Sequence, residues 1–175
     1  MVRQKRHHEE WNIYHVMIRC NNQQMLLRKR ETKLLLIGCF GKMQERIGYK
    51  IYGFIVMDNH AHWLIQVQGK HGLSVVMQKV LLSFGRYYRE RNRFVGYFWQ
   101  GRYKSVGIVT DHAMREVLKY VHDNPVKANM AEQAEDYVYS SAKEYQQGKD
   151  EFIDKMLVIT KYGDTSAGSC ELLKA

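Results

Sequence analysis

The sequence predicts an α+β fold, a ferredoxin-like split βαβ plait in which a four-stranded antiparallel sheet carries helices on one face. Two observations predict this class. Apolar residues alternate or run together over four short segments, and they recur at three- and four-residue spacing over longer ones. The order along the chain is strand, helix, strand, strand, helix, strand, followed by one more helix.

The first half of the chain predicts a strand, a helix and then a hairpin of two strands. These elements are expected, in order, at residues 11–20, 30–47, 49–57 and 60–68. Gly48 is expected to end the helix, because glycine readily adopts the left-handed conformation that follows a helix C-terminus. Asp58 and Asn59 are typical turn residues, and they separate the two strands of the hairpin.

The second half predicts a helix, a strand and a last helix. Residues 72–93 carry an apolar stripe at helical spacing, with several arginines near its C-terminal end. The segment 98–109 is typical of an aromatic loop that leads into a fourth strand. Thr110 or Asp111 can cap the last helix, which should end before Pro125 because proline disfavours helical geometry in the residue before it.

Composition restricts the class of protein. The 175 residues are 45% hydrophobic and 12% aromatic, which predicts one domain, expected at 1–147, with a loosely structured tail at 148–175. The 27 Lys and Arg residues against 18 Asp and Glu give a formal charge of +9, which favours an anionic partner such as nucleic acid. The absence of a long apolar run and the three widely spaced cysteines predict a cytoplasmic protein that does not enter a membrane.

Two histidines lie two residues apart in the predicted strand 60–68. Because strand side chains alternate between faces, His60 and His62 point to the same side. The opposite side is apolar, so we expect it to pack under the helices and to leave the histidines on an uncovered face. Two imidazoles on one face can bind a single cation if a third ligand joins them, and the same spacing also arises by chance.

A second polar pair lies near the predicted end of the last helix. Tyr120 lies beside the apolar stripe of that helix, and Asn124 follows it by one turn. Each residue also has an ordinary interpretation: Tyr120 is one of 12 tyrosines, and an asparagine directly before Pro125 is a good helix N-cap. The residues alone leave both interpretations open.

Three segments, in this order and at this spacing, resemble the single-tyrosine HUH transposases, a family named after two histidines around a hydrophobic residue. The segments are VMDNHAHWLIQ, FWQGRYKS and YVHDNPVKANM, and the similarity extends from about Tyr14 to Tyr145. The branch that they resemble is the REP-associated tyrosine transposases. Asp58 departs from the pattern, because relatives often have proline there, and we expect this difference to alter the stiffness of the turn more than the chemistry.

The resemblance implies a role for each matching residue. His60, His62 and Asn124 would bind a divalent cation, Mg²⁺ or Mn²⁺, and Tyr120, on a helix additional to the plait, would be the catalytic nucleophile. The implied reaction is the cleavage and rejoining of single-stranded, hairpin-forming DNA through a 5′-phosphotyrosine intermediate. The enzyme would be a DNA transposase that acts on REP-like sequences as a monomer or a homodimer.

Basic and aromatic side chains are expected to contact the DNA. Arginine and lysine bind phosphates, and aromatic rings stack on unpaired bases. The candidates are Arg86, Arg89, Trp99, Arg102 and Lys104, with Phe98 as a second stacking residue.

Two other functions stay open at this point. An RRM-like plait could bind structured single-stranded nucleic acid without cutting it, although the glycine and aromatic motif expected on its central strand is absent. A metal-dependent phosphodiesterase could use water as the nucleophile in place of Tyr120. The variant Tyr120→Phe separates these functions from the transposase, which alone forms a covalent product.

Overall fold

The computed structural model of the protein describes residues 12–67 and 71–146. The tail expected at 148–175 therefore lies outside the described residues, as do Trp11 and Gln68 at the ends of two expected strands. Within the described part the elements follow the predicted order. Most of their boundaries differ from the predicted ones by no more than a residue or two, and the fourth strand begins only after the aromatic loop.

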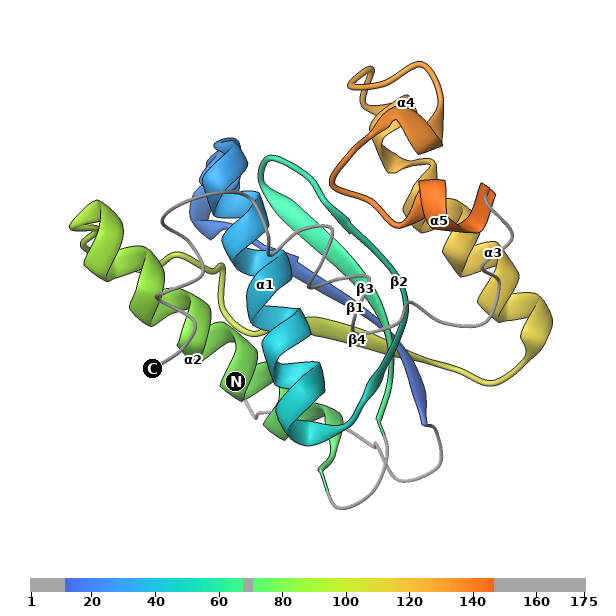
Figure 1. Cartoon of the computed structure of the whole chain (residues 1–175), viewed down its shortest axis with the longest axis horizontal. Helices are drawn as coiled ribbons and strands as arrows, with labels where there is room; N and C mark the ends of the chain where they lie inside the picture. The colour runs from blue at the N-terminus through green and yellow to red at the C-terminus, as the bar shows by residue number, and fades with distance from the viewer. Residues whose placement is uncertain (1–11, 68–70, 147–175) are drawn as a thin grey trace.

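Four strands form one antiparallel sheet in the spatial order β2-β3-β1-β4 (Figure 1). They are β1 (Ile13–Arg19), β2 (Lys50–Val56), β3 (His60–Gln66) and β4 (Lys104–Ile108). β2 and β3 form the predicted hairpin, whereas the connections from β1 to β2 and from β3 to β4 each run through a helix. This order is that of a split βαβ plait, so the predicted fold class is confirmed.

Two helices cover one face of the sheet (Figure 1). They are α1 (Arg30–Ile47) and α2 (Leu73–Asn92), which pack against each other. The apolar side of β3 lies under them, as predicted. The ring of Trp63 stacks on Phe40 of α1 and on Phe54 of β2, with centroid distances of 3.6 and 4.8 Å. The main hydrophobic core therefore lies between these helices and the sheet.

Two helix ends follow the expected sequence signals. Gly48 adopts a left-handed conformation (φ 80°) after α1, and its N–H donates to the carbonyl of Gln44. Thr110 caps the helix α3 (Asp111–His122), because its hydroxyl accepts a hydrogen bond from the N–H of Ala113 at 3.1 Å. Capping fixes the residue at which α3 begins and stabilises its first turn.

The opposite face of the sheet is partly covered, which corrects the expectation that it would be open. α3 crosses this face and contacts β2 and β3. The helix approaches so closely that a Cβ atom at Gly53 of β2 would lie 2.4 Å from Cδ1 of Leu118. The apolar stripe of α3 excludes water from the apolar residues of this face, and this burial favours packing over exposure. The buried residues on this face form a second hydrophobic cluster, which comprises Ile55, Met57, Leu64, Ile108, Val121 and Tyr137.

The chain after α3 returns along the outer edge of β2. The N–H of Val56 donates to the carbonyl of Tyr139, and the N–H of Ser141 donates to the carbonyl of Phe54, at 2.9 and 3.1 Å. These bonds occupy backbone groups that an edge strand would otherwise expose. The remaining elements are the short helices α4 (Asn124–Lys127) and α5 (Ala142–Gln146) and two 3-10 turns at Asn21–Gln23 and Ala134–Asp136.

The hairpin turn takes part in an ion pair with α1. The side chain of Lys33 is 3% exposed, and its ammonium group donates a hydrogen bond to the carboxylate of Asp58. A buried ammonium is costly unless a carboxylate pairs with it. Asp58 therefore has a second role besides its expected effect on the stiffness of the turn.

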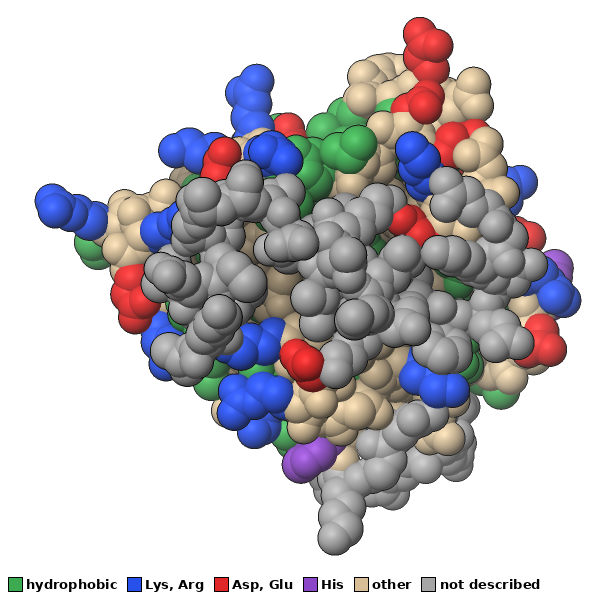
Figure 2. All heavy atoms as spheres, viewed as in Figure 1, with side chains coloured by type: hydrophobic (Ala, Val, Ile, Leu, Met, Phe, Trp, Pro, Cys, Tyr) green, Lys and Arg blue, Asp and Glu red, His purple; other side chains and the backbone are tan. Residues whose placement is uncertain are grey.

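The molecular surface agrees with the basic composition. Lys and Arg side chains project over the region of α1 and α2 in the view of Figure 2. A membrane span would require a longer apolar helix than any that residues 12–67 and 71–146 form.

Candidate active site

Three imidazole rings lie together on the sheet face that α3 crosses. His60 and His62 come from β3, and His15 comes from β1, where it is a diagonal neighbour of His62. The ring centroids of His15 and His62 are 5.1 Å apart, and those of His60 and His62 are also 5.1 Å apart. The two predicted histidines therefore have a third beside them, which was not among the predicted site residues.

The Nδ1 atoms of both β3 histidines have hydrogen-bond partners. Nδ1 of His62 lies 2.9 Å from Nε2 of His15, and Nδ1 of His60 lies 2.6 Å from Oδ1 of Asn59. The amide oxygen of Asn59 is an acceptor, so His60 donates from Nδ1 and carries its lone pair on Nε2. Within the described residues, Nε2 of His60 and Nε2 of His62 have no hydrogen-bond partner.

Burial favours the neutral form of these rings. His62 is 2% exposed, and burial lowers its pKa to about 3, with the nearby rings of His60 and His15 adding to the effect. Burial also lowers the pKa of His60 and that of His15. Near neutral pH each ring is therefore neutral, which is the form of histidine that binds metal ions. The low exposure of His62 corrects the expectation that it would lie on an uncovered face.

Helix α3 brings Tyr120 to the same place. The centroid of its ring lies 5.8 Å from that of His62 and 6.2 Å from that of His15, and it is edge-on to both. The residue is 46% exposed. A ligand in solvent can therefore reach the tyrosine while the ring stays beside the imidazoles.

A buried hydrogen-bond network ties α3 to the sheet next to Tyr120. The hydroxyl of Ser141 donates to the carbonyl of Phe54 and accepts from the N–H of Phe54. It is also hydrogen-bonded to Nε2 of His122, 2.8 Å away. His122 is buried, and burial lowers its pKa to about 4. This network fixes α3 on the sheet two residues beyond Tyr120.

Asn124 lies at the junction of α3 and α4. Its side-chain Nδ2 donates to the carbonyls of Tyr120 and Val121, at 2.8 and 3.2 Å. It does not cap α4, because Asp123 occupies the N-cap position and Asn124 is the first helical residue. Within the described residues Oδ1 of Asn124 has no hydrogen-bond partner, so this oxygen can still bind a ligand. Within the same residues no hydrogen bond joins it to His60 or His62.

The two β3 histidines are not a complete metal site on their own. Among residues 12–67 and 71–146, no three His, Cys, Asp or Glu side chains form a group that could hold a metal ion. A cation at His60 and His62 would therefore need a ligand of another kind, such as an amide or phosphate oxygen. Two imidazole nitrogens with oxygen ligands suit Mn²⁺ and are compatible with Mg²⁺.

Lys127 is a second residue near Tyr120 that was not predicted. Its ammonium nitrogen lies 5.1 Å from the centroid of the Tyr120 ring. The sequence held a signal for His15, because it lies on the same strand face as Ile13 and Met17, in a strand that a plait pairs with β3. It held none for Lys127, which lies in the separate short helix α4 beyond Pro125.

Three of the predicted DNA-binding residues line one groove. The groove has a volume of about 580 Å³ and lies between α2 and the loop 96–103. Arg89, Trp99 and Arg102 are among its lining residues. Arg86 is exposed on α2, and its guanidinium group lies 4.9 Å from the ring centroid of Tyr87.

Lys104 lies on the same sheet face as the histidines. It pairs with Met17 of β1, which pairs in turn with His62, so these three residues form a row across the sheet. Lys104 is therefore about 10 Å from His62, the distance of two strand spacings. Val106, which lies opposite His15, is exposed. The β4 side of this face is thus open beside the histidines.

The aromatic candidates differ in exposure. Phe98 is 7% exposed and packs against Phe84 and Tyr88, with centroid distances of 4.8 and 4.6 Å. The expectation that Phe98 stacks on bases is wrong, because its ring is part of the core. Trp99 is partly exposed, and its neighbour Tyr97 is 83% exposed at the groove.

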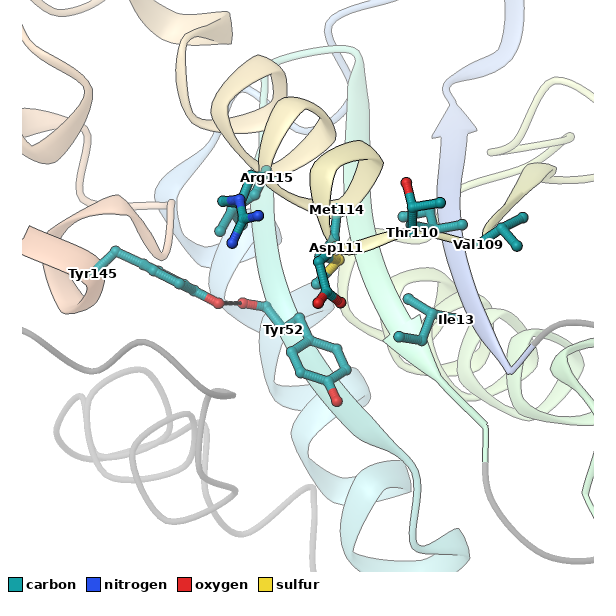
Figure 3. A pocket seen from close by; sticks show the side chains of 10 residues that line it. Ile13, Tyr52, Val109, Thr110, Asp111, Met114, Arg115 and Tyr145 are labelled. Atoms are coloured by element: carbon teal, nitrogen blue, oxygen red, sulfur yellow. Dashed lines mark hydrogen bonds between the residues drawn. The ribbon is translucent and has the colours of Figure 1, made fainter.

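A separate cavity of about 480 Å³ lies at the N-terminal end of α3 (Figure 3). Its lining includes Asp111 and Arg115 of α3 and none of the predicted site residues. The hydroxyl of Tyr145 donates to the backbone carbonyl of Tyr52 beside it, which links α5 to β2.

Two solved structures share this fold. A REP-associated tyrosine transposase bound to a REP hairpin aligns with a TM-score of 0.72 and 18% identity, over 89% of this chain and 93% of that chain. A putative transposase from Deinococcus radiodurans R1 aligns with a TM-score of 0.50 and 15% identity, over 70% of this chain and 97% of that chain. At these identities the likeness supports the fold. No curated protein sequence matches the chain.

A family model connects the chain to a group of enzymes. The model, described as IS200-like transposase, matches residues 10–124. The match spans more than half of the chain and contains His60, His62, Tyr120 and Asn124. The family that the three sequence segments predict is therefore confirmed. This chain belongs to the IS200-like transposase family.

Proposed function

We propose that this chain is a DNA strand transferase that cuts and rejoins single-stranded DNA through a 5′-phosphotyrosine intermediate on Tyr120. The observation that carries the proposal is the position of the half-exposed Tyr120 ring beside His62 and His15. Membership of a transposase family supports the class of reaction. The REP hairpin bound to the structural neighbour supports hairpin-forming DNA as the substrate.

The proposed reaction exchanges one phosphate ester for another. A bond forms between the Tyr120 oxygen and phosphorus, and the bond between phosphorus and the 3′ oxygen breaks. The phenol loses a proton, and the leaving 3′ oxygen gains one. Because the number of ester bonds does not change, no external energy source is needed. A second DNA 3′-hydroxyl can then attack the phosphotyrosine and join the strands.

The side chains around Tyr120 have distinct roles in this proposal. His60, His62 and Asn124 would hold a divalent cation, Mg²⁺ or Mn²⁺, which when bound polarises the scissile phosphate and offsets its charge. The anchor of α3 at Ser141 keeps the phenol beside that phosphate. The ammonium group of Lys127, near the Tyr120 ring, adds positive charge where the phosphate must enter.

The DNA strand would follow the open β4 side of the histidine-bearing face and reach the groove beside α2. Basic residues along this route would bind phosphates, and the ring of Trp99 would stack on an unpaired base. The proposed phosphate contacts are Arg86, Arg89, Arg102 and Lys104.

The experiment that tests this function uses a hairpin-bearing DNA strand labelled at its 3′ end. The label then stays with the fragment that carries the 5′-phosphotyrosine. With Mn²⁺, the wild-type protein should give a slowly migrating band on a denaturing gel, and Tyr120→Phe should give none. Tyr139→Phe is the matched control, because it removes a hydroxyl with no hydrogen-bond partner in the described residues.

The other outcomes point to the two other functions. Cleavage by Tyr120→Phe would mean that water is the nucleophile and that the protein is a phosphodiesterase. Binding of the hairpin without any product from the wild-type protein would mean a plait that binds nucleic acid and does not cut it. Either result would overturn the proposal.

A further inference from the structure

To bind a cation, each of the two β3 histidines of the candidate site needs a ring nitrogen with a free lone pair. A neutral imidazole carries a proton on one ring nitrogen and a lone pair on the other, and only the nitrogen with the lone pair can bind a cation. Both Nδ1 atoms are already in hydrogen bonds, to Asn59 and to His15. A cation shared by His60 and His62 would therefore have to bind at both Nε2 atoms.

The proton position on His60 follows from its partner. Oδ1 of Asn59 can only accept, so the proton lies on Nδ1 of His60 and the lone pair lies on Nε2. Nδ2 of Asn59 donates to the carbonyl of Gln23 at 3.4 Å, which keeps the amide oxygen turned toward the ring. His60 is thus prepared for a cation by the hairpin turn beside it.

His62 has a partner that allows two arrangements. If His15 donates from Nε2, the proton of His62 lies on its own Nε2 and blocks that atom. If His15 accepts at Nε2, His62 donates from Nδ1, and its Nε2 lone pair is free. No sequence neighbour of His62 can replace His15 as the hydrogen-bond partner of Nδ1, because Ala61 and Trp63 point to the other face.

The geometry of the contact between His15 and His62 is that of a directed hydrogen bond. The nitrogen atoms are 2.9 Å apart, the ring planes differ by 19°, and the centroids are 5.1 Å apart. With the two nitrogen atoms only 2.9 Å apart, the ring centroids can be 5.1 Å apart only if both nitrogen atoms lie close to the line that joins the centroids. That line is also the direction of a ring-nitrogen lone pair, so the rings lie edge to edge rather than face to face.

We propose that His15 and Asn59 are positioning residues that hold His62 and His60 in the Nδ1–H form, with both Nε2 atoms directed to one divalent cation. This inference rests on the proposed function, since it concerns the same site. It assigns a role to a residue of β1 that would not itself bind the cation. Partners of this kind orient metal-binding histidines, and their loss typically lowers metal affinity 10- to 100-fold.

The test compares two variants of His15 in the full chain without DNA. His15→Gln keeps an acceptor oxygen, whereas His15→Leu removes the acceptor at similar bulk. Mn²⁺ affinity is measured by calorimetry, and the proton position on His62 is read from imidazole ¹⁵N shifts in the metal-free protein. Leucine should weaken Mn²⁺ binding 10- to 100-fold and move the His62 proton to Nε2. Glutamine should retain most of the affinity and the Nδ1–H form.

Two variants of Asn59, in the hairpin turn, test the inference without any change at His15. Asn59→Asp retains an acceptor and Asn59→Ala does not, so only alanine should release the His60 proton from Nδ1. Equal affinity of His15→Leu and wild type, or equal loss in His15→Leu and His15→Gln, would overturn the inference. If Mn²⁺ binding behaves as expected but no covalent product forms, the function proposed for Tyr120 fails and this inference stands.

Discussion

The ring of Tyr120 is perpendicular to the ring of His62, with centroids 5.8 Å apart, and both residues belong to the same chain. The link from His122 to Ser141 fixes α3 on its own sheet two residues beyond Tyr120. If the proposed function holds, the nucleophile and the imidazoles act in cis. A single chain would then contain a complete site without an exchanged helix.

Mixing two inactive variants tests the cis arrangement. Tyr120→Phe lacks the nucleophile and His62→Ala lacks an imidazole. Because each chain would supply both groups to its own site, an equimolar mixture should form no more covalent product than either variant alone. Wild-type protein mixed with either variant is the positive control. Recovery of product in the mixture of variants would show that α3 is shared between chains.

Gly53→Ala should disturb the packing of α3 on the sheet. The added Cβ would lie 2.4 Å from Leu118 Cδ1, so the helix or the side chain must move. We expect a loss of about 1–3 kcal/mol in the free energy of unfolding and a lower rate of covalent product formation, because Tyr120 lies on the same helix.

The double variant Gly53→Ala with Leu118→Ala restores the space and should recover part of that rate. Gly72→Ala is the matched control, since a Cβ there meets nothing within 4 Å. A normal rate in Gly53→Ala would show that the position of Tyr120 does not depend on this contact.

Strand β3 shows which features of the site can be predicted from the sequence and which cannot. Alternation is a local property, so the sequence predicts correctly that His60 and His62 share a face and that Trp63 lies under the helices. Whether α3 covers that face depends on tertiary packing, which the spacing of its apolar residues does not specify. The burial of His62 could therefore not be predicted from the strand.

His15 and Phe98 show the same limit. His15 meets His62 only through the register of β1 against β3, and register follows from the pairing of the whole sheet. Phe98 and Trp99 are adjacent aromatic residues in a basic loop, which favours a DNA-contacting role for both. The structure places both rings in one aromatic cluster with Phe84, and they differ in exposure: Phe98 is buried, whereas Trp99 stays partly exposed.

Removing arginines from the groove beside α2 should weaken DNA binding without abolishing it. If Arg89 and Arg102 each neutralise one phosphate, Arg89→Gln and Arg102→Gln should each lower the slope of log affinity against log salt by about 0.7. Fluorescence anisotropy of a labelled hairpin at several salt concentrations measures this slope. Arg46→Gln, at the end of α1 and outside the groove, is the control. An unchanged slope would place the DNA elsewhere.

Asp58→Asn should destabilise the fold by leaving the Lys33 ammonium without a carboxylate. Lys33 is 3% exposed but Asp58 is 25% exposed, so we expect a loss of about 2–4 kcal/mol rather than the full cost of breaking a buried pair. Urea unfolding measures this loss in the free energy of unfolding. The double variant Lys33→Met with Asp58→Asn should regain stability, because no buried charge remains. Wild-type stability of Asp58→Asn would contradict a structural role for this pair.

The stability of the protein should fall on mild acidification, in part because of His122. Burial lowers its folded-state pKa to about 4, whereas the unfolded chain has the ordinary value of 6.5. Between these values the unfolded state binds more protons, so this contribution is fully present above pH 6.5 and is lost as the pH falls toward 4. The contribution is at most about 3 kcal/mol. Urea unfolding at pH 7.5 and pH 5 measures the loss.

His122→Gln isolates this residue from the other buried histidines. Glutamine can still form a hydrogen bond with the hydroxyl of Ser141 but does not titrate, so the variant should lose less stability than wild type over the same pH interval. His62 stays in both proteins, and its own lowered pKa contributes equally to each. Equal losses in the two proteins would mean that His122 is already charged in the folded state, which its burial between α3 and β2 opposes.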